Sequence, residues 1–353
     1  MKTPILDAMR QATEAVRSGN PTDATRLIQQ VLSGNPAPAA TPDDDFDGVT
    51  IEGTVDPSAT GDARGAGAAQ EGATLPMVSQ SYGCAAGSRD YKLFLPPQAP
   101  GGVRGLIVML HGCTQNPDDF ARGTAMNAIA AREGLIVAYP GQTTDKNANG
   151  CWNWFEPLDQ RRGAGEPAIL AGMAQEIAKT HDVPKGAIYA AGLSAGGAMA
   201  AILGDAYPDV FAAVGVHSGL AAGSAKDVPS AFAAMNGTGL PGGFAVTPGA
   251  EHARMMIVHG TRDRTVVAAN GTRLFERMQR AFPEATVQRD PAGKGDIARL
   301  KLVQPDGTVV VEHWQIAGLA HAWSGGNGAG SFTAPRAPDA SEGFMRFFLD
   351  EKT

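Results

Sequence analysis

Cysteine is scarce in this chain, with three residues among 353. A count this low excludes a scaffold that is built on several disulfides. Cys113 and Cys151 both fall in stretches that we place near one site. A single disulfide between them, which would leave Cys84 unpaired, and three free thiols are therefore both possible. Histidine and cysteine are scattered without the spacing of metal ligands, so we expect no metal and no other cofactor.

Long apolar runs are also absent, which excludes a membrane-spanning helix of about 20 residues. Residues 1–11 contain no apolar stretch of the kind that a Sec-type signal peptide has. On that ground we expect a cytoplasmic protein, with export by another route as the alternative.

Clusters of lysine and arginine are missing as well. The chain has 29 basic and 36 acidic residues, which gives a net charge of −7. This balance excludes the large basic surface that attracts nucleic acid or an anionic membrane. We therefore expect no nucleic-acid partner and no transmembrane segment.

The residues that are present divide the chain into three parts. Apolar residues recur at helical spacing over 1–35 and predict a helical hairpin, which packs on the chain itself or docks a partner. Residues 36–80 are dominated by Pro, Ala, Gly, Asp and Thr and predict a flexible linker. Residues 81–353 have the apolar content of a large folded domain.

In this third part, apolar runs that are typical of buried strands alternate with segments of helical spacing. The strand-like stretches are 88–96, 106–110, 135–140, 187–189, 211–216, 255–260, 285–291, 297–304 and 309–316, and the helical ones are 117–132, 166–180, 198–203, 270–281 and 340–349. The segment 220–250 is rich in Gly, Ala and Pro and is expected to be a long excursion. This alternation predicts a mostly parallel sheet with helices on both faces.

One strand-turn-helix junction carries the pattern G-x-S-x-G, at Gly192 to Gly196 with Ser194 in the middle. A serine on so sharp a turn has strained backbone angles, and side chains at the flanking glycines would collide with neighbouring elements. The turn points the hydroxyl outward and brings the next N–H to a helix N-terminus. The alternative is a glycine-rich turn without chemistry.

The loops that follow the parallel strands meet at one edge of the sheet. Three of them bring Ser194, Asp263 and His321 to that edge, in the chain order of α/β-hydrolases. We predict that Ser194 is the nucleophile, that His321 is the base and that Asp263 orients it. The N–H groups of Ala195 and Cys113 are expected to form the oxyanion hole.

Three tryptophans fall in loops rather than in apolar runs, namely Trp323, Trp152 and Trp154. Trp323 lies two residues after His321. We predict that these side chains line the substrate site; the alternative is that they anchor their loops on the core.

These motifs together resemble the polyhydroxybutyrate depolymerase-type esterase family of α/β-hydrolases, which has feruloyl and acetyl xylan esterases among its relatives. The motifs are Leu110-His111-Gly112-Cys113-Thr114-Gln115, Asp119-Phe120, Tyr139-Pro140, Cys151-Trp152-Asn153-Trp154-Phe155, Gly192-Leu193-Ser194-Ala195-Gly196-Gly197, His259-Gly260 with Asp263, and His321-Ala322-Trp323-Ser324-Gly325-Gly326. The resemblance implies an α/β-hydrolase catalytic domain at 81–353 and a serine esterase that cleaves poly- or oligo-3-hydroxybutyrate-like esters through an acyl-enzyme. The alternatives are feruloyl or acetyl xylan esters as substrates, and a non-catalytic binding protein on the same fold.

Overall fold

The computed structural model describes residues 75–97, 102–239, 243–290 and 297–349. The predicted hairpin at 1–35 and nearly all of the predicted linker at 36–80 lie outside these residues. The first described strand, β1, begins at Val78, so the sheet already includes residues that precede position 81.

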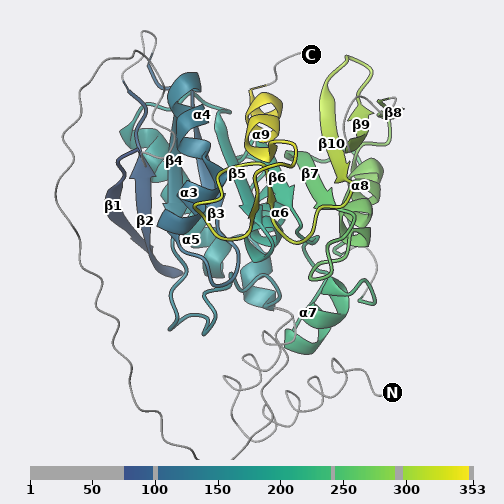
Figure 1. Ribbon diagram of the computed structural model, residues 1–353, viewed down its shortest axis with the longest axis horizontal. Coiled ribbons are helices and arrows are strands. Elements are labelled where there is room, and N and C mark those ends of the chain that lie inside the picture. Colours follow the sequence, from purple (N-terminus) through teal and green to yellow (C-terminus); the bar gives the residue numbers. More distant parts are fainter. Residues whose placement is uncertain (1–74, 98–101, 240–242, 291–296, 350–353) are drawn as a thin grey trace, which may run out of the picture. The chain divides into compact units, whose positions relative to one another are not determined.

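The described residues form a ten-stranded sheet in the order β1-β2-β4-β3-β5-β6-β7-β10-β9-β8 (Figure 1). Its strands are β1 (Val78–Cys84), β2 (Gly87–Phe94), β3 (Gly105–Leu110), β4 (Leu135–Pro140), β5 (Ile188–Leu193), β6 (Ala213–His217), β7 (Arg254–Gly260), β8 (Thr286–Arg289), β9 (Ile297–Val303) and β10 (Val309–Ile316). The six central strands, in the spatial order β4-β3-β5-β6-β7-β10, pair in parallel. At the two edges of the sheet, β1, β2, β8 and β9 pair antiparallel. The fold is that of an α/β-hydrolase, as predicted.

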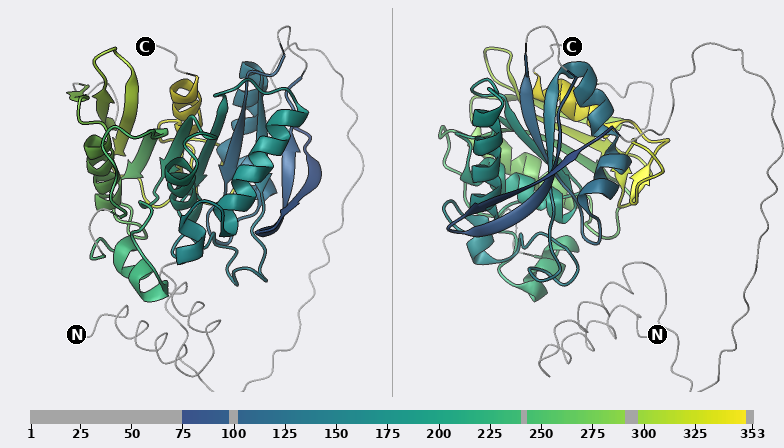
Figure 2. Two further views of the ribbon diagram at one scale, coloured as in Figure 1. Left: turned by 180° about the vertical axis from the view of Figure 1, so that it is seen from behind. Right: turned by 90° about the vertical axis from the view of Figure 1, so that its left-hand side faces the viewer.

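Helices cover both faces of this sheet (Figures 1 and 2). One face contacts α5 (Gly165–Thr180), α6 (Ala195–Ala206) and α8 (Ala269–Ala281). The other contacts α3 (Pro117–Thr124), α4 (Met126–Glu133) and α9 (Ala340–Phe348).

The two hydrophobic cores follow from the alternation of side chains along the central strands. In β3, Leu106, Val108 and Leu110 pack into one core, while Ile107 and Met109 pack into the other. Successive side chains of a strand point to opposite faces, and a strand that is buried on both faces therefore reads as an unbroken apolar run. This is why the sequence identifies the central strands clearly.

Two local predictions are wrong. The helix expected over 117–132 is divided into α3 and α4 at Ala125, which has a left-handed φ of 53°. The excursion at 220–250 contains a helix, α7 (Val228–Met235), which begins at a capping box formed by Asp227 and Ser230. The first difference is a helix boundary, where apolar spacing carries little information, whereas the second is a short helix within a glycine-rich segment.

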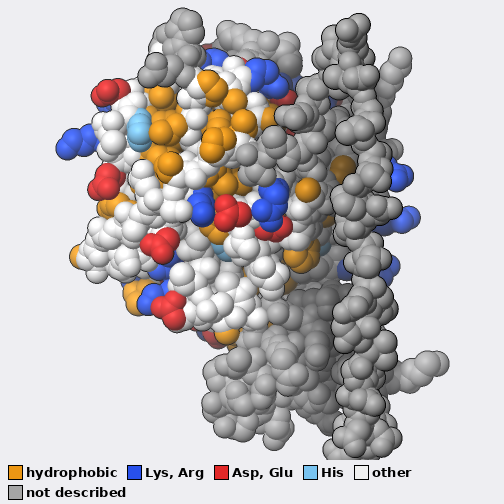
Figure 3. Space-filling view, turned by 60° about the vertical axis from the view of Figure 1, so that its left-hand side comes forward, with side chains coloured by type: hydrophobic (Ala, Val, Ile, Leu, Met, Phe, Trp, Pro, Cys, Tyr) orange, Lys and Arg blue, Asp and Glu red, His pale blue; other side chains and the backbone are white. Residues whose placement is uncertain are grey.

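The edge strand β1 is largely exposed, and Val78 has half of its surface accessible. Figure 3 brings the side with β1 and β2 forward and shows hydrophobic side chains gathered over part of it. Among the helices of the described ranges, none combines the length and the apolar content that a bilayer crossing needs.

Candidate active site

The carboxyl ends of four parallel strands bring the predicted residues to one edge of the sheet. Cys113 follows β3, Ser194 follows β5, Asp263 follows β7 and His321 follows β10. β3 pairs with β5, and β7 pairs with β10, while β6 lies between these two pairs. The expected convergence of these loops therefore follows directly from the strand order.

Ser194 occupies the strained turn that the sequence predicts. Its φ is 59° and its ψ is −118°, and α6 begins at the next residue. A Cβ on Gly196 would collide with the carbonyl oxygens of Leu110 and His111, and one on Gly192 would collide with Gly196. The glycines of the motif are thus required because the elbow is in direct contact with the end of β3.

His321 and Asp263 form a close pair, in which His321 Nδ1 lies 2.7 Å from Asp263 Oδ2. Because an ionised carboxylate can only accept, Nδ1 carries the proton and the lone pair of the ring is on Nε2. His321 keeps 13% of its side chain exposed, while that of Asp263 is fully buried. No hydrogen bond between Ser194 and His321 is found among the described residues; such bonds are often loose in a free enzyme and tighten on substrate binding.

Asp263 is ionised although it is buried. Burial by itself raises the pKa of a carboxyl group, but the hydrogen bonds from His321 and from the Val266 N–H outweigh it, so the pKa of Asp263 lies below its ordinary value. Its other oxygen, Oδ1, accepts the N–H groups of Thr265 at 3.0 Å and Val266 at 2.9 Å. These donors fix the carboxylate in the plane that His321 needs.

Two N–H groups beside Ser194 are available to an oxyanion. Ala195 is the first residue of α6, and the N–H groups of a first helical turn have no acceptor within the helix. The N–H of Cys113 has no hydrogen bond to any described residue, although its neighbours Gly112 and Thr114 both donate theirs within the protein. Both predicted oxyanion donors are therefore free, and a Cβ on Gly112 would lie 3.7 Å from that of Ser194.

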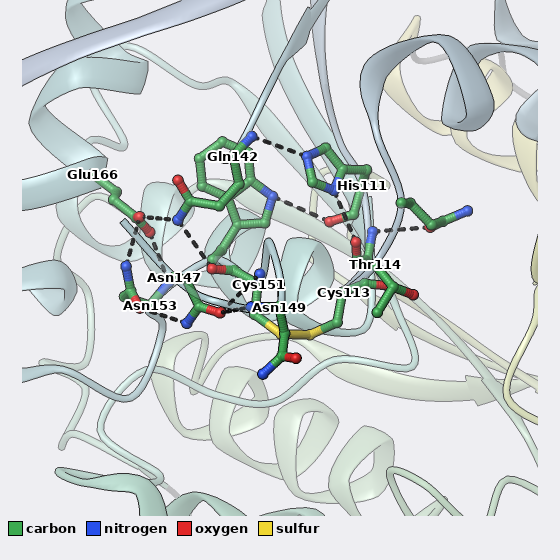
Figure 4. Close-up of a disulfide and its surroundings, with 12 residues drawn as sticks. His111, Cys113, Thr114, Gln142, Asn147, Asn149, Cys151, Asn153 and Glu166 are labelled. Atoms are coloured by element: carbon green, nitrogen blue, oxygen red, sulfur yellow. Dashed lines mark hydrogen bonds between the residues drawn. A yellow bond between two sulfur atoms is a disulfide. The ribbon is translucent and has the colours of Figure 1, made fainter. Parts of the chain in front are cut away.

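A disulfide joins Cys113 to Cys151, and Cys84 is free and exposed. This resolves the choice that the sequence left open. Thr114 N–H also donates to Asn149 O at 2.9 Å, so the loop after β3 is attached twice to the loop after β4 (Figure 4).

The loop after β4 is in turn attached to a buried carboxylate, Glu166 of α5. This group accepts hydrogen bonds from Gln142 Nε2 and from Asn153 N and Nδ2 (Figure 4). It also pairs with Arg89 at 3.0 Å. Gln142 N–H donates to Nε2 of His111 at 3.1 Å. Glu166 carries no signal of this role in the sequence, because a lone Glu at a helix start is typically solvated.

His217, at the end of β6, connects the elbow to the base loop. Its carbonyl oxygen accepts Ser194 N–H at 2.9 Å, and its Nε2 accepts Ser324 N–H at 3.0 Å. Burial, together with the neighbouring His259 and His321, lowers the pKa of His217 to about 3, so the ring is neutral and can accept. The ring of His217 also packs, because it stacks on Trp323.

The prediction that the three loop tryptophans line the substrate site is not supported by their positions. Trp152 and Trp323 have no exposed surface, and Trp154 is only 6% exposed. Trp152 Nε1 donates to His111 O, and Trp323 Nε1 donates to Ser341 Oγ. These side chains anchor loops on the core, which was the stated alternative, and in this conformation they present almost no surface to a ligand.

The fold and the strand-end residues together define the class of α/β-hydrolases. A family model described as "Esterase PHB depolymerase" matches residues 89–296, which is more than half of the chain. The protein belongs to this family, as the motifs predict.

Sequence relatives agree with this assignment, and a solved structure agrees with the fold. The chain is 30% identical over 237 residues to poly(3-hydroxyalkanoate) depolymerase C of Paucimonas lemoignei, covering 64% of this chain and 56% of that protein. It is 29% identical over 232 residues to feruloyl esterase B of Neurospora crassa, covering 61% of this chain and 77% of that protein. An acetyl xylan esterase from Aspergillus awamori has a similar fold, with a TM-score of 0.58, 17% identity, and coverage of 74% of this chain and 94% of that one. The chain thus spans little more than half the length of the depolymerase.

Proposed function

We propose that the protein is a serine carboxylic-ester hydrolase that acts on poly- or oligo-3-hydroxybutyrate-like esters. The observation that carries this proposal is the buried Asp263–His321 pair at 2.7 Å, at the same sheet edge as the elbow of Ser194. The family and its depolymerase relative support the ester class.

The geometry supports a two-step mechanism. His321 Nε2 takes the proton of Ser194 Oγ as the oxygen attacks the ester carbonyl, and Asp263 stabilises the imidazolium. The N–H groups of Ala195 and Cys113 bind the oxyanion. Collapse of the tetrahedral intermediate transfers the proton to the leaving alcohol, and water, activated by the same histidine, releases the acid from Ser194.

The direct test replaces Ser194. Ser194→Ala should reduce hydrolysis of p-nitrophenyl butyrate to background and abolish fluorophosphonate labelling, with unchanged thermal unfolding. Ser81→Ala is the control, because Ser81 is an exposed serine of the edge strand β1, outside the strand-end loops. It should keep both activity and labelling, and an active Ser194→Ala variant would contradict the proposal.

A second candidate changes only the substrate, to feruloyl or acetylated sugar esters. It is favoured by the similarity to the Neurospora crassa feruloyl esterase, which covers most of that protein. Hydroxybutyrate dimers, methyl ferulate and acetylated xylan assayed in parallel, with Ser194→Ala as the blank, distinguish the two. The larger kcat/KM identifies the substrate class.

Docking through the hairpin at 1–35 and a cytoplasmic location stay predictions. The hairpin lies outside the described residues. Comparison of the full chain with a chain that begins at residue 74, in binding to amorphous polymer and to cell extract, tests the docking role.

A further inference from the structure

The loop that carries the oxyanion donor Cys113 has a specific pattern of hydrogen bonds. Gly112 N–H donates to Gln115 Oε1 at 3.0 Å, and Gln115 N–H donates back to Gly112 O at 3.3 Å. The amide between them, Cys113 N–H, is left without an acceptor among the described residues. The side chain of Gln115 therefore determines which amide of this loop stays available.

The orientation of the Gln115 amide is itself fixed by its surroundings. Gln115 is only 6% exposed, and its Nε2 faces three oxygens: Asp119 Oδ2 at 3.1 Å, Ser331 O at 3.1 Å and Ser331 Oγ at 3.2 Å. A flipped amide would turn Oε1 toward these acceptors and NH₂ toward Gly112 N–H. The reversed orientation is thus excluded.

Asp119, in the first turn of α3, completes the link to Ser331. Its Oδ1 accepts Ser331 N–H at 3.0 Å, and its Oδ2 accepts the Ser331 hydroxyl at 2.5 Å. Partial burial raises the pKa of this carboxyl group, but the hydrogen bonds from Ser331 and Gln115 outweigh that effect and lower it. The group is an ionised acceptor that holds both donors of one serine.

Ser331 lies on the segment that also positions the base. The next residue, Phe332, accepts Trp323 N–H at 2.7 Å, and the short strands β11 (Trp323–Ser324) and β12 (Thr333–Ala334) pair in parallel. β11 begins two residues after His321. The contacts of Gln115 and Asp119 therefore join the oxyanion loop to the base loop, across more than 200 residues of sequence.

We infer that Gln115 and Asp119 are positioning residues that fix the Cys113 N–H relative to His321. The inference rests on the proposed function. Neither side chain needs to touch the substrate, because they act through Gly112 and Ser331. An oxyanion donor is effective only at the site where charge develops, so a loosened loop lowers kcat with little effect on KM.

Gln115→Ala should lower kcat for p-nitrophenyl butyrate by tenfold or more and change KM by less than twofold, since one oxyanion donor is worth about 10²–10³ in kcat. Ser331→Ala, at an exposed position, should produce a smaller fall in kcat and serves as the variant least prone to misfolding. Asp227→Ala is the control for a general loss of stability: it removes the N-cap of α7 and no contact of Gln115, Asp119 or Ser331. It should lower stability and leave kcat unchanged.

Gln115→Glu provides a readout that general destabilisation does not move. It keeps the acceptor for Gly112 N–H but places a second carboxyl group against Asp119, and two such groups share one proton as the pH falls. The ratio of variant to native kcat should therefore be low at pH 8 and rise toward pH 5, and the ratio cancels any pH dependence that both proteins share.

Native kcat in Gln115→Ala and Gln115→Glu, a pH-independent ratio, or an equal loss of kcat in Asp227→Ala would overturn the inference. Failure of the proposed function is distinguishable, because it would appear as esterase activity that Ser194→Ala leaves intact.

Discussion

Asp263 has the most informative surroundings of any single residue in the site. It is buried, yet it accepts two backbone N–H groups, binds His321 and lies 3.6 Å from His259 Nε2. The Nε2–H of His259 donates a hydrogen bond to Val266 O at 2.8 Å. His259 therefore supports the loop and does not compete with His321 for the carboxylate. A carboxylate in this position holds the imidazole of His321 in one tautomer, so it contributes to catalysis by orienting that ring.

Asp263→Asn should lower kcat by a factor on the order of 10⁴, because an amide NH₂ facing Nδ1 favours the tautomer with the proton on Nε2. Steady-state hydrolysis of p-nitrophenyl butyrate measures the loss. Asp209→Asn is the control, since Asp209 is an exposed ion-pair partner of Arg162 beyond the elbow helix. Equal loss in both variants would mean that Asp263 does not orient the base.

At the scale of elements, the sequence was sufficient for the central strands, the elbow and the strand-end residues, because each depends on local pattern and on chain order. The sequence was insufficient for features that depend on tertiary contacts. Ala125 is a good helix former that adopts a left-handed conformation between α3 and α4. Trp152 and Trp323 lie in loops that fold onto the core, and loop position alone does not report burial.

The disulfide could not be predicted for a related reason. Cys113 and Cys151 are 38 residues apart, and only the packing of the loop after β4 against that after β3 brings them together. The capping box of α7 pairs Asp227 with Ser230, which differs from the S/T-x-x-E/Q signature by which such boxes are identified in a sequence.

Reduction of the disulfide tests the bracing of the oxyanion loop. A cross-link that closes a loop of this length stabilises a protein by about 4 kcal/mol in the chain-entropy model. Dithiothreitol should therefore lower the free energy of unfolding by about that amount, and it should reduce kcat because Cys113 N–H is less well fixed. The matched control is Cys84→Ser, which should unfold like the native protein and respond to dithiothreitol as it does. Full activity and stability in protein that mass spectrometry shows to be reduced would contradict this account.

For the described part of the molecule as a whole, buried histidines set the response to acid. Burial lowers the pKa of His217 to about 3 and that of His313 to about 3. In the unfolded chain both return to about 6.5, so between pH 6.5 and 3 the unfolded state binds more protons. The contribution of each histidine to the free energy of unfolding is fully present above pH 6.5. As the pH falls below that value, it is lost by about 1.4 kcal/mol per pH unit for each histidine. The lowered pKa of Asp263 adds a further loss below about pH 4.

Urea unfolding at a series of pH values should thus show little change above pH 6.5 and a fall of about 3 kcal/mol per pH unit below about pH 6. His313→Gln should reduce this slope by about 1.4 kcal/mol per pH unit, which is the share of one buried histidine. A flat profile between pH 6.5 and 4.5 would show that the two rings are already charged in the folded protein.

The central claim, that Ser194 is the nucleophile, is tested most directly by trapping the acyl-enzyme. Rapid acid quenching during turnover of an ester that deacylates slowly, followed by peptide mass spectrometry, locates the added acyl group. We expect the mass of the acyl group on the peptide that contains Ser194, and we expect no acylated peptide in Ser194→Ala. An acyl group on another residue, or turnover without any acylated peptide, would contradict it.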